Sequence, residues 1–122
     1  KDLEDLPLIF RENGSATRNA MERYLDSHGI RPSRKLVLVS NEAVKQAVNA
    51  GLGVSIMPII GLRNELKLGS IRIVPLPDLP IITRWNLVYR SGKELLPAAK
   101  AFMEYIKKEK HHLAEQHFGW VE

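Results

Sequence analysis

The sequence predicts an α/β fold with a mostly parallel sheet. Short apolar runs that suit buried strands alternate along the chain with amphipathic stretches of helical periodicity, and turn residues separate them. Short helices between buried strands imply right-handed parallel crossovers. With 122 residues, 44% of them hydrophobic and 26% charged, the chain can form one packed domain or a large piece of a bigger one.

The first strand is predicted over residues 6–10, an apolar run that suits burial on both faces. Turn residues end this strand, and Ser15 is placed to cap a helix. Gly29 stops that helix, with Ile30 positioned to close a Schellman-type cap. The apolar stripe of the helix consists of Ala20, Met21, Tyr24, Leu25 and His28.

A second strand over residues 35–40 leads into a second helix, capped by Ser40 or Asn41 and ended by Gly51. The next elements are an apolar strand, a short helix and an alternating strand. They are expected at residues 53–57, from Pro58 to Leu66 or Leu68, and at residues 70–76.

Residues 75–80 contain the densest group of prolines and are expected to form a stiff connector between two packed units. Beyond it, residues 84–90 alternate as a strand, and a last helix starts near Leu95. Residues from Lys107 onward lose helical periodicity, so 111–122 are expected to form a flexible tail. The stripe of the last helix consists of Leu95, Ala99, Phe102 and Ile106.

Composition excludes several classes of protein. The chain has no cysteine, which rules out disulfides, cysteine-ligated metals and cysteine nucleophiles, and which fits a reducing cytosol. No apolar run approaches the roughly 20 residues that cross a bilayer, and the charged start shows no signal peptide. The net charge of +4 is mild and its basic residues are interleaved with acidic ones, so charge alone does not predict nucleic-acid binding.

The carboxyl ends of the first two strands are the expected ligand site. In open α/β sheets, ligands bind outside these ends. Each end precedes a helix N-terminus, whose unpaired N–H groups and positive dipole end favour a small anion or carboxylate. The candidate ligand-binding residues are Phe10, Arg11, Ser15, Thr17, Ser40 and Asn41.

Each candidate also has a purely structural interpretation. Ser15 and Ser40 are helix caps in any case, and capping alone is preferred over capping plus ligand contact. Phe10 either borders the expected ligand site or belongs to the core, and the core is preferred.

The charged residues have structural alternatives too. Two arginines either clamp an anion or pair with nearby glutamates, and pairing is preferred. The residues concerned are Arg11 and Arg18, with Glu12 and Glu22 as the partners.

Histidines and lysines near the end of the chain raise the question of a metal or phosphate site. Neither group shows the spacing of a known motif, so solvated side chains are preferred for both. The residues are His111, His112, Glu115 and His117 for the metal, and Lys100, Lys107, Lys108 and Lys110 for phosphate.

No catalytic motif is present. The chain has no G-x-S-x-G elbow, no Walker loop and no G-x-G-x-x-G, and its acidic residues are scattered. We therefore expect no enzyme, no cofactor and no metal.

Three segments resemble a known family, the LysR-type transcriptional regulators. Residues 10–18 resemble the family's R-E-x-G-S-x-T-R turn, 40–58 resemble its second signature and 95–102 are similar to its final helix. The departures are small: Asn13 stands where the family often has proline, and Ala16 where it often has glycine.

The resemblance implies an effector domain like the type 2 periplasmic binding proteins, with two α/β lobes around a cleft. Residues 6–80 would supply lobe II and 81–110 the return segment of lobe I. The winged helix-turn-helix, the linker helix and the first half of lobe I would lie outside this chain. The implied protein is cytoplasmic and bacterial. It binds a small effector between its lobes and reaches DNA only through the domain absent here.

The resemblance also implies assembly with itself as a dimer or higher oligomer, with the helix over 16–28 and the strand over 36–39 at the subunit interface. The alternative is a fragment of a periplasmic solute-binding protein or of an enzyme with the same two-lobe fold, because a fold does not decide a function. For this chain by itself we expect self-association through residues 82–106, or a folding-back of that segment, because its apolar faces lack their partner.

Overall fold

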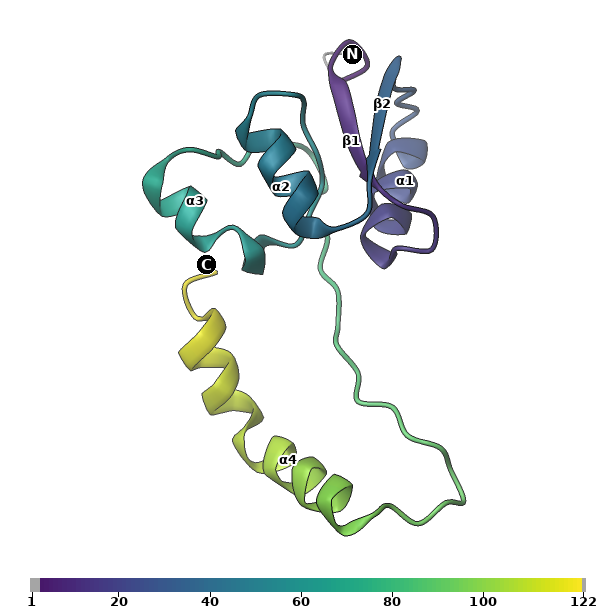
Figure 1. The fold of residues 1–122 in the computed structure, drawn as a ribbon, viewed down its shortest axis with the longest axis vertical. Coiled ribbons are helices and arrows are strands. Elements are labelled where there is room, and N and C mark those ends of the chain that lie inside the picture. The colour runs from purple at the N-terminus through teal and green to yellow at the C-terminus, as the bar shows by residue number, and fades with distance from the viewer. Residues whose placement is uncertain (1–2, 122) are drawn as a thin grey trace. The chain divides into compact units, whose positions relative to one another are not determined.

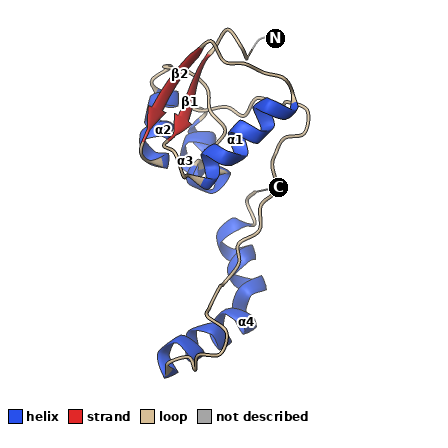
Figure 2. Ribbon diagram, turned by 90° about the vertical axis from the view of Figure 1, so that its right-hand side faces the viewer, coloured by secondary structure: helices blue, strands red, loops and turns tan. Residues whose placement is uncertain are grey.

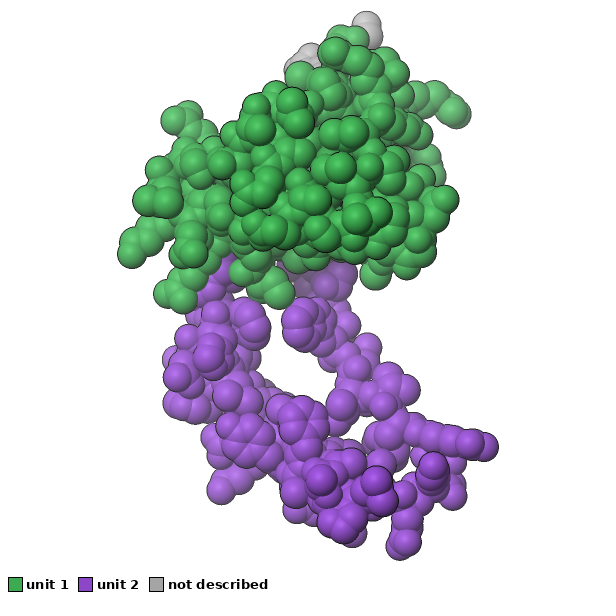
Figure 3. All heavy atoms as spheres, in the orientation of Figure 1, with its two compact units in different colours: residues 1–81 green, residues 82–122 purple. Residues whose placement is uncertain are grey.

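The computed structural model describes residues 3–121, and these fall into two compact units that meet between residues 81 and 82 in the sequence, unit 1 before this point and unit 2 after it (Figure 3). Unit 1 carries all the strands and most of the helices, and unit 2 consists of an extended segment followed by one long helix. The elements in chain order are β1 (Pro7–Arg11), α1 (Ala16–Ser27), β2 (Arg34–Leu38), α2 (Asn41–Asn49), a 3-10 turn (Ile59–Gly61), α3 (Arg63–Leu68) and α4 (Pro97–Phe118) (Figure 1).

Strands β1 and β2 pair in parallel, with Leu8 opposite Lys35 and Phe10 opposite Val37. The parallel crossover predicted from the alternation of strands and helices is therefore confirmed. The helix between them, α1, lies on one side of the strand pair and α2 on the other (Figures 1 and 2). Strand β1 is buried along its centre, whereas β2 is exposed over most of its length.

The side chains of β1 alternate between two apolar clusters, as burial on both faces requires. Leu8 and Phe10 point to the α1 side, and Ile9 points to the α2 side. Three of the five predicted stripe residues of α1 are buried, namely Met21, Tyr24 and Leu25. On α2 the buried residues are Val44 and Ala47.

The predicted helix caps are confirmed. The Ser15 hydroxyl accepts a hydrogen bond from the backbone amide three residues later, and Ser40 does the same at the start of α2. At the end of α1, the Ile30 amide donates to the Leu25 carbonyl and the Gly29 amide to the Asp26 carbonyl, the two bonds of a Schellman motif. Gly29 adopts the left-handed conformation that this motif needs.

The strand predicted at residues 53–57 shrinks to a single bridge. The Val54 amide donates a hydrogen bond to the Pro7 carbonyl of β1, and the Val54 carbonyl accepts one from the Ile9 amide. A longer ladder would use the Ile9 carbonyl next, but this carbonyl accepts from the Ser55 hydroxyl at 2.7 Å. Beyond the bridge at Val54, the contact with Ile9 thus comes from the Ser55 side chain, and the described residues form no further backbone pairing there.

The strands predicted at 70–76 and 84–90 are wrong for this structure. Neither segment is assigned as a strand, and Ile73, Trp85 and Leu87 are exposed. A strand needs a hydrogen-bonded neighbour, and neither segment has one among residues 3–121. Alternation of side chains alone does not supply that neighbour.

The helices after Pro58 follow the prediction more closely. A 3-10 turn precedes α3, which ends at Leu68. The last helix, α4, begins at Pro97, two residues after the predicted Leu95, because proline is favoured in the first helical turn. It continues to Phe118, so residues 111–118 of the tail expected at 111–122 are helical in the structure. The backbone hydrogen bonds of the helix therefore continue through a segment whose apolar side chains show no clear helical periodicity.

Candidate functional site

Arg11 links the ends of the two neighbouring elements at the predicted ligand site. It is the last residue of β1, and its Nη1 donates a hydrogen bond to Oδ1 of Asn41, the first residue of α2. Its Nε and Nη2 donate to the two carboxylate oxygens of Glu12 at 2.7 and 2.9 Å. All three nitrogens of the guanidinium therefore donate a hydrogen bond to Glu12 or Asn41.

Arg18, in the first turn of α1, secures the same strand end from the other side. Its Nη1 donates to the backbone carbonyl of Arg11 at 3.1 Å, and its Nε pairs with Glu22 at 2.8 Å. The guanidinium also lies 5.7 Å from the centre of the Phe10 ring. The preferred interpretation, in which both arginines pair with glutamates, is confirmed.

The two serines and Thr17 lie at the helix starts. Ser15 and Ser40 accept from main-chain amides, so the hydroxyl hydrogen of each is available to a further acceptor. At the start of α2, Ser40 accepts hydrogen bonds from the amides of Ala43 and Val44. The amides of Asn41 and Glu42 have no acceptor among the residues described. Thr17 is half-buried in the first turn of α1.

Phe10 does not join this group. Its side chain is 2% exposed and belongs to the cluster under α1, whereas Arg11 points to the α2 side of the strand. The alternation of β1 separates these neighbours, because successive side chains of a strand point to opposite faces. The burial of Phe10 confirms the core interpretation.

The charges at the site largely compensate one another. Hydrogen bonding from Arg11 lowers the pKa of Glu12, and the same contact raises the pKa of Arg11. On α2, hydrogen bonds from Gln46 and then Lys45 lower the pKa of Glu42. Among the described residues at these strand ends, the features that favour an anion are unpaired amides, hydroxyl groups and helix dipoles rather than an unpaired cation.

Lys45 forms the electrostatic link between α2 and α3. Its Nζ lies 2.9 Å from Glu42 Oε2 and 3.0 Å from Glu65 Oε1, and its side chain is 14% exposed. The Glu65 carbonyl in turn accepts the amides of Ser70 and Ile71. Neither the spacing nor the apolar pattern of the sequence indicated this link.

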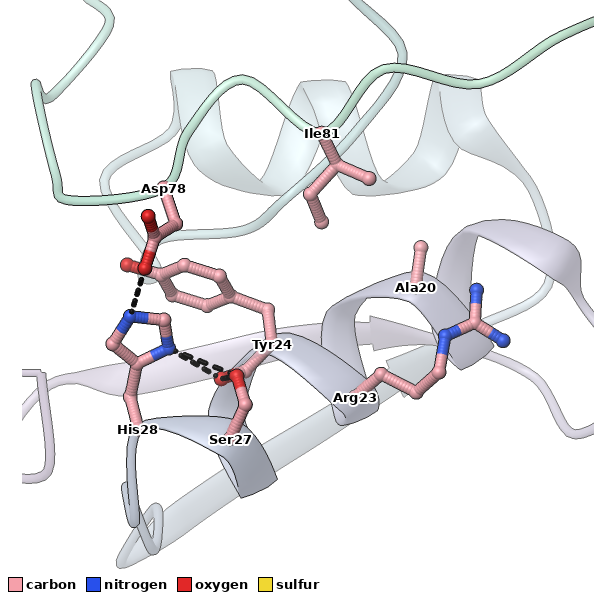
Figure 4. Close-up of a pocket in the computed structure, with 7 residues that line it drawn as sticks. All are labelled: Ala20, Arg23, Tyr24, Ser27, His28, Asp78 and Ile81. Carbon is pink, nitrogen blue, oxygen red and sulfur yellow. Dashed lines mark hydrogen bonds and ion pairs between the residues drawn. The ribbon is translucent and has the colours of Figure 1, made fainter.

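An open recess of about 340 Å³ lies against α1 on unit 1, away from the strand ends (Figure 4). Here the Tyr24 hydroxyl donates to the Pro77 carbonyl at 2.9 Å, and His28 Nε2 lies 3.1 Å from Asp78 Oδ2. His28 was predicted as part of an apolar stripe, but it is turned toward this carboxylate. The contacts hold the proline-rich segment against the helix.

Over the described residues, 3–121, no group of three His, Asp or Glu side chains is placed to hold a metal ion. In the same part of the chain, no helix is both long and apolar enough to cross a membrane. The histidines near the end, His111, His112 and His117, all lie on α4, with His117 in its last turn.

Parallel strands flanked by helices, with polar groups at their carboxyl ends, give an α/β fold of the periplasmic-binding-protein-like class. Residues 1–110 match the family described as the LysR substrate binding domain. The chain belongs to the LysR family.

Curated relatives support this assignment. The chain is 41% identical over 104 residues to the RuBisCO operon transcriptional regulator of Acidithiobacillus ferrooxidans, covering 85% of this chain and 34% of that protein. It is 40% identical over 106 residues to the HTH-type transcriptional regulator CbbR of Rhodospirillum rubrum, covering 87% and 36%. The chain thus spans about a third of the length of these relatives.

Two solved structures share the fold. The regulatory domain of CcmR from Synechocystis PCC6803, solved in complex with 2-PG, has a TM-score of 0.76 at 34% identity, covering 88% of this chain and 51% of that one. The apo regulatory domain of HypT from Salmonella typhimurium has a TM-score of 0.72 at 20% identity, covering 90% and 54%. The second likeness bears on the fold alone.

Proposed function

We propose that this chain is the effector-sensing part of a bacterial LysR-type transcriptional regulator. Residues 6–80 form lobe II, and residues 81–110 form the return segment of lobe I. A small anionic effector binds in the cleft between the lobes and biases the regulator's arrangement on DNA. The chain acts by binding rather than by catalysis, in the cytoplasm.

The observation that carries the proposal is the contact between Arg11 and Asn41 at the carboxyl ends of the two parallel strands. It brings the start of α2 to the end of β1, where polar groups can reach one ligand. The proposed effector-binding set is Ser15, Thr17, Ser40 and Asn41, with Arg11 beside them.

The donors at this site favour a ligand rich in acceptor oxygens. Hydroxyl groups and unpaired main-chain amides all donate, and the dipole of α2 favours negative charge. The CcmR regulatory domain was solved with 2-PG, which makes 2-PG the first probe for this chain.

The proposed partners beyond the effector are a second copy of the protein and DNA. DNA is contacted through a winged helix-turn-helix outside this chain. Self-assembly uses α1 and β2, and the exposed apolar side chains of β2 and its exit suit burial against another subunit. These are Leu36, Val37 and Val39.

Isothermal titration of the complete two-lobe domain with 2-PG and with inorganic phosphate tests the effector site. We expect the double variant Ser40→Ala with Asn41→Ala to weaken binding by about a hundredfold or more, since each of the two lost hydrogen bonds to a charged ligand is worth roughly 1.5–3 kcal/mol. The matched control changes the exposed Ser91 and Asn64 to alanine.

Unchanged affinity in the Ser40/Asn41 double variant would remove both residues from the site. A signal peptide in place of a winged helix-turn-helix upstream of this segment would contradict the regulator and support a solute-binding protein.

A further inference from the structure

We infer that Arg11 is a positioning residue whose role is to orient the Asn41 carboxamide, and that Glu12 holds Arg11 in place for this task. The inference rests on the proposed effector site and assigns different roles to the residues within it. Asn41 presents its amide N–H groups to the ligand, and Arg11 does not itself bind the anion.

The geometry of Arg11 supports this role. Three of its five N–H groups donate hydrogen bonds, from Nε and Nη2 to the two oxygens of Glu12 and from Nη1 to Asn41 Oδ1. The side chain is only 17% exposed. A guanidinium bound in this bidentate way has little freedom to turn toward a ligand.

Contact with the Asn41 oxygen fixes which end of the carboxamide faces outward. If the amide were flipped, its NH₂ group would face the guanidinium, and two donors would oppose each other. Asn41 is exposed, and its Nδ2 has no acceptor among the residues described. The group left for a ligand is therefore a donor, and its partner is an acceptor oxygen.

The main chain of Arg11 is fixed as well. Arg18 donates to the Arg11 carbonyl, and Arg18 is itself held by Glu22. The series of contacts from Glu22 to Asn41 thus joins the first turn of α1 to the first turn of α2 across the end of β1. A change in this series is expected to act on the ligand through Asn41.

Two single variants separate positioning from direct binding of the anion. If Arg11 bound the anion, Glu12→Gln would leave the positive charge of Arg11 unpaired and tighten the binding of 2-PG. Arg11→Lys would then keep much of the affinity. If Arg11 positions Asn41, both variants weaken binding, by about tenfold for the loss of one oriented hydrogen bond. Titration of the complete regulatory domain, the kind of unit in which CcmR and HypT were solved, measures this.

A double-mutant cycle tests whether Arg11 acts through Asn41. We expect Arg11→Lys and Glu12→Gln to change affinity by less than about twofold in an Asn41→Ala background, because the group that they orient is absent. Additive losses, or tighter binding by Glu12→Gln, would overturn the inference.

A measurement without ligand keeps the inference separate from the proposed function. In nitrogen-15 spectra, the Asn41 side-chain amide, assigned with Asn41→Ala, should shift in Glu12→Gln and Arg11→Lys, and the Asn64 amide should not. An unmoved Asn41 signal would overturn the positioning role. Failure of the unaltered domain to bind 2-PG or phosphate, with a shifted Asn41 signal, would count against the effector site alone.

Discussion

The hydroxyl of Tyr24 donates a 2.9 Å hydrogen bond to the carbonyl of Pro77, 53 residues further along the chain. Next to it, His28 contacts Asp78, and Leu79 packs against the cluster that contains Tyr24. The segment at which the chain leaves unit 1 is thereby held against the C-terminal half of α1 (Figure 4).

Removing the hydroxyl should therefore loosen this attachment. We expect Tyr24→Phe to lower the free energy of unfolding by about 1 kcal/mol, since the ring stays in the core and one hydrogen bond is lost. Urea unfolding of the two-lobe domain measures it. Tyr105→Phe, a change at an exposed tyrosine, serves as the control and should have no measurable effect.

Gly53 lies against β1, and a Cβ at this position would overlap the Pro7 carbonyl oxygen and lie 3.0 Å from the carbonyl carbon. Gly53→Ala should force the bridge at Val54 apart and destabilise the domain by about 1–3 kcal/mol. Gly61→Ala, where a Cβ meets no atom within 4 Å, is the matched control. Equal stability of the two variants would contradict the close approach.

The link through Lys45 predicts a dependence of stability on acid pH. Hydrogen bonding from Lys45 lowers the pKa of Glu65 from its ordinary value of 4.5. The contribution of the ionised Glu65 carboxylate to the stability of the fold is thus present above its unfolded-state pKa. This contribution is lost as pH falls through its folded-state pKa. We expect Glu65→Gln to flatten the loss of stability between about pH 5 and pH 3.

Thermal unfolding at a series of pH values measures this effect. Glu104→Gln, at an exposed position of α4, should leave the slope unchanged. A slope in Glu65→Gln as steep as in the unaltered domain would show that the link makes no contribution.

Unit 2 exposes large apolar side chains on the extended segment and on α4. Trp85 is 82% exposed, and Leu87, Tyr89 and Phe102 are exposed as well. Burying each would be worth roughly 1.5–3 kcal/mol, so the isolated chain should self-associate at about 100 µM through residues 82–106. Light scattering that gives a monomer mass, with Trp85 fluorescence of a solvated indole, would disprove this.

DNA binding provides the last prediction. The chain alone should show no sequence-specific complex in a gel-shift assay at physiological salt, because its charges are mixed and no segment matches a helix-turn-helix. A submicromolar specific complex formed by this chain would contradict the assignment of DNA contact to another domain.

Local signals in the sequence were enough to predict β1, the first two helices and their ends. The Ser15 and Ser40 caps and the Gly29 motif involve residues within a few positions of one another, so short patterns specify them. The apolar run of β1 likewise predicted burial on both faces of the strand, including the preference for Phe10 in the core. Three family-like segments then indicated the family that the comparison with known proteins confirms.

Contacts between distant residues decided the rest. Whether residues 53–57 extend the sheet depended on the Ser55 hydroxyl reaching Ile9, and the role of Arg11 depended on Asn41, 30 residues away. A helix closes its hydrogen bonds within its own turns, so its sequence predicts it. A strand, an ion pair or a ligand site is completed by a partner elsewhere in the chain, and only the tertiary structure brings that partner within reach.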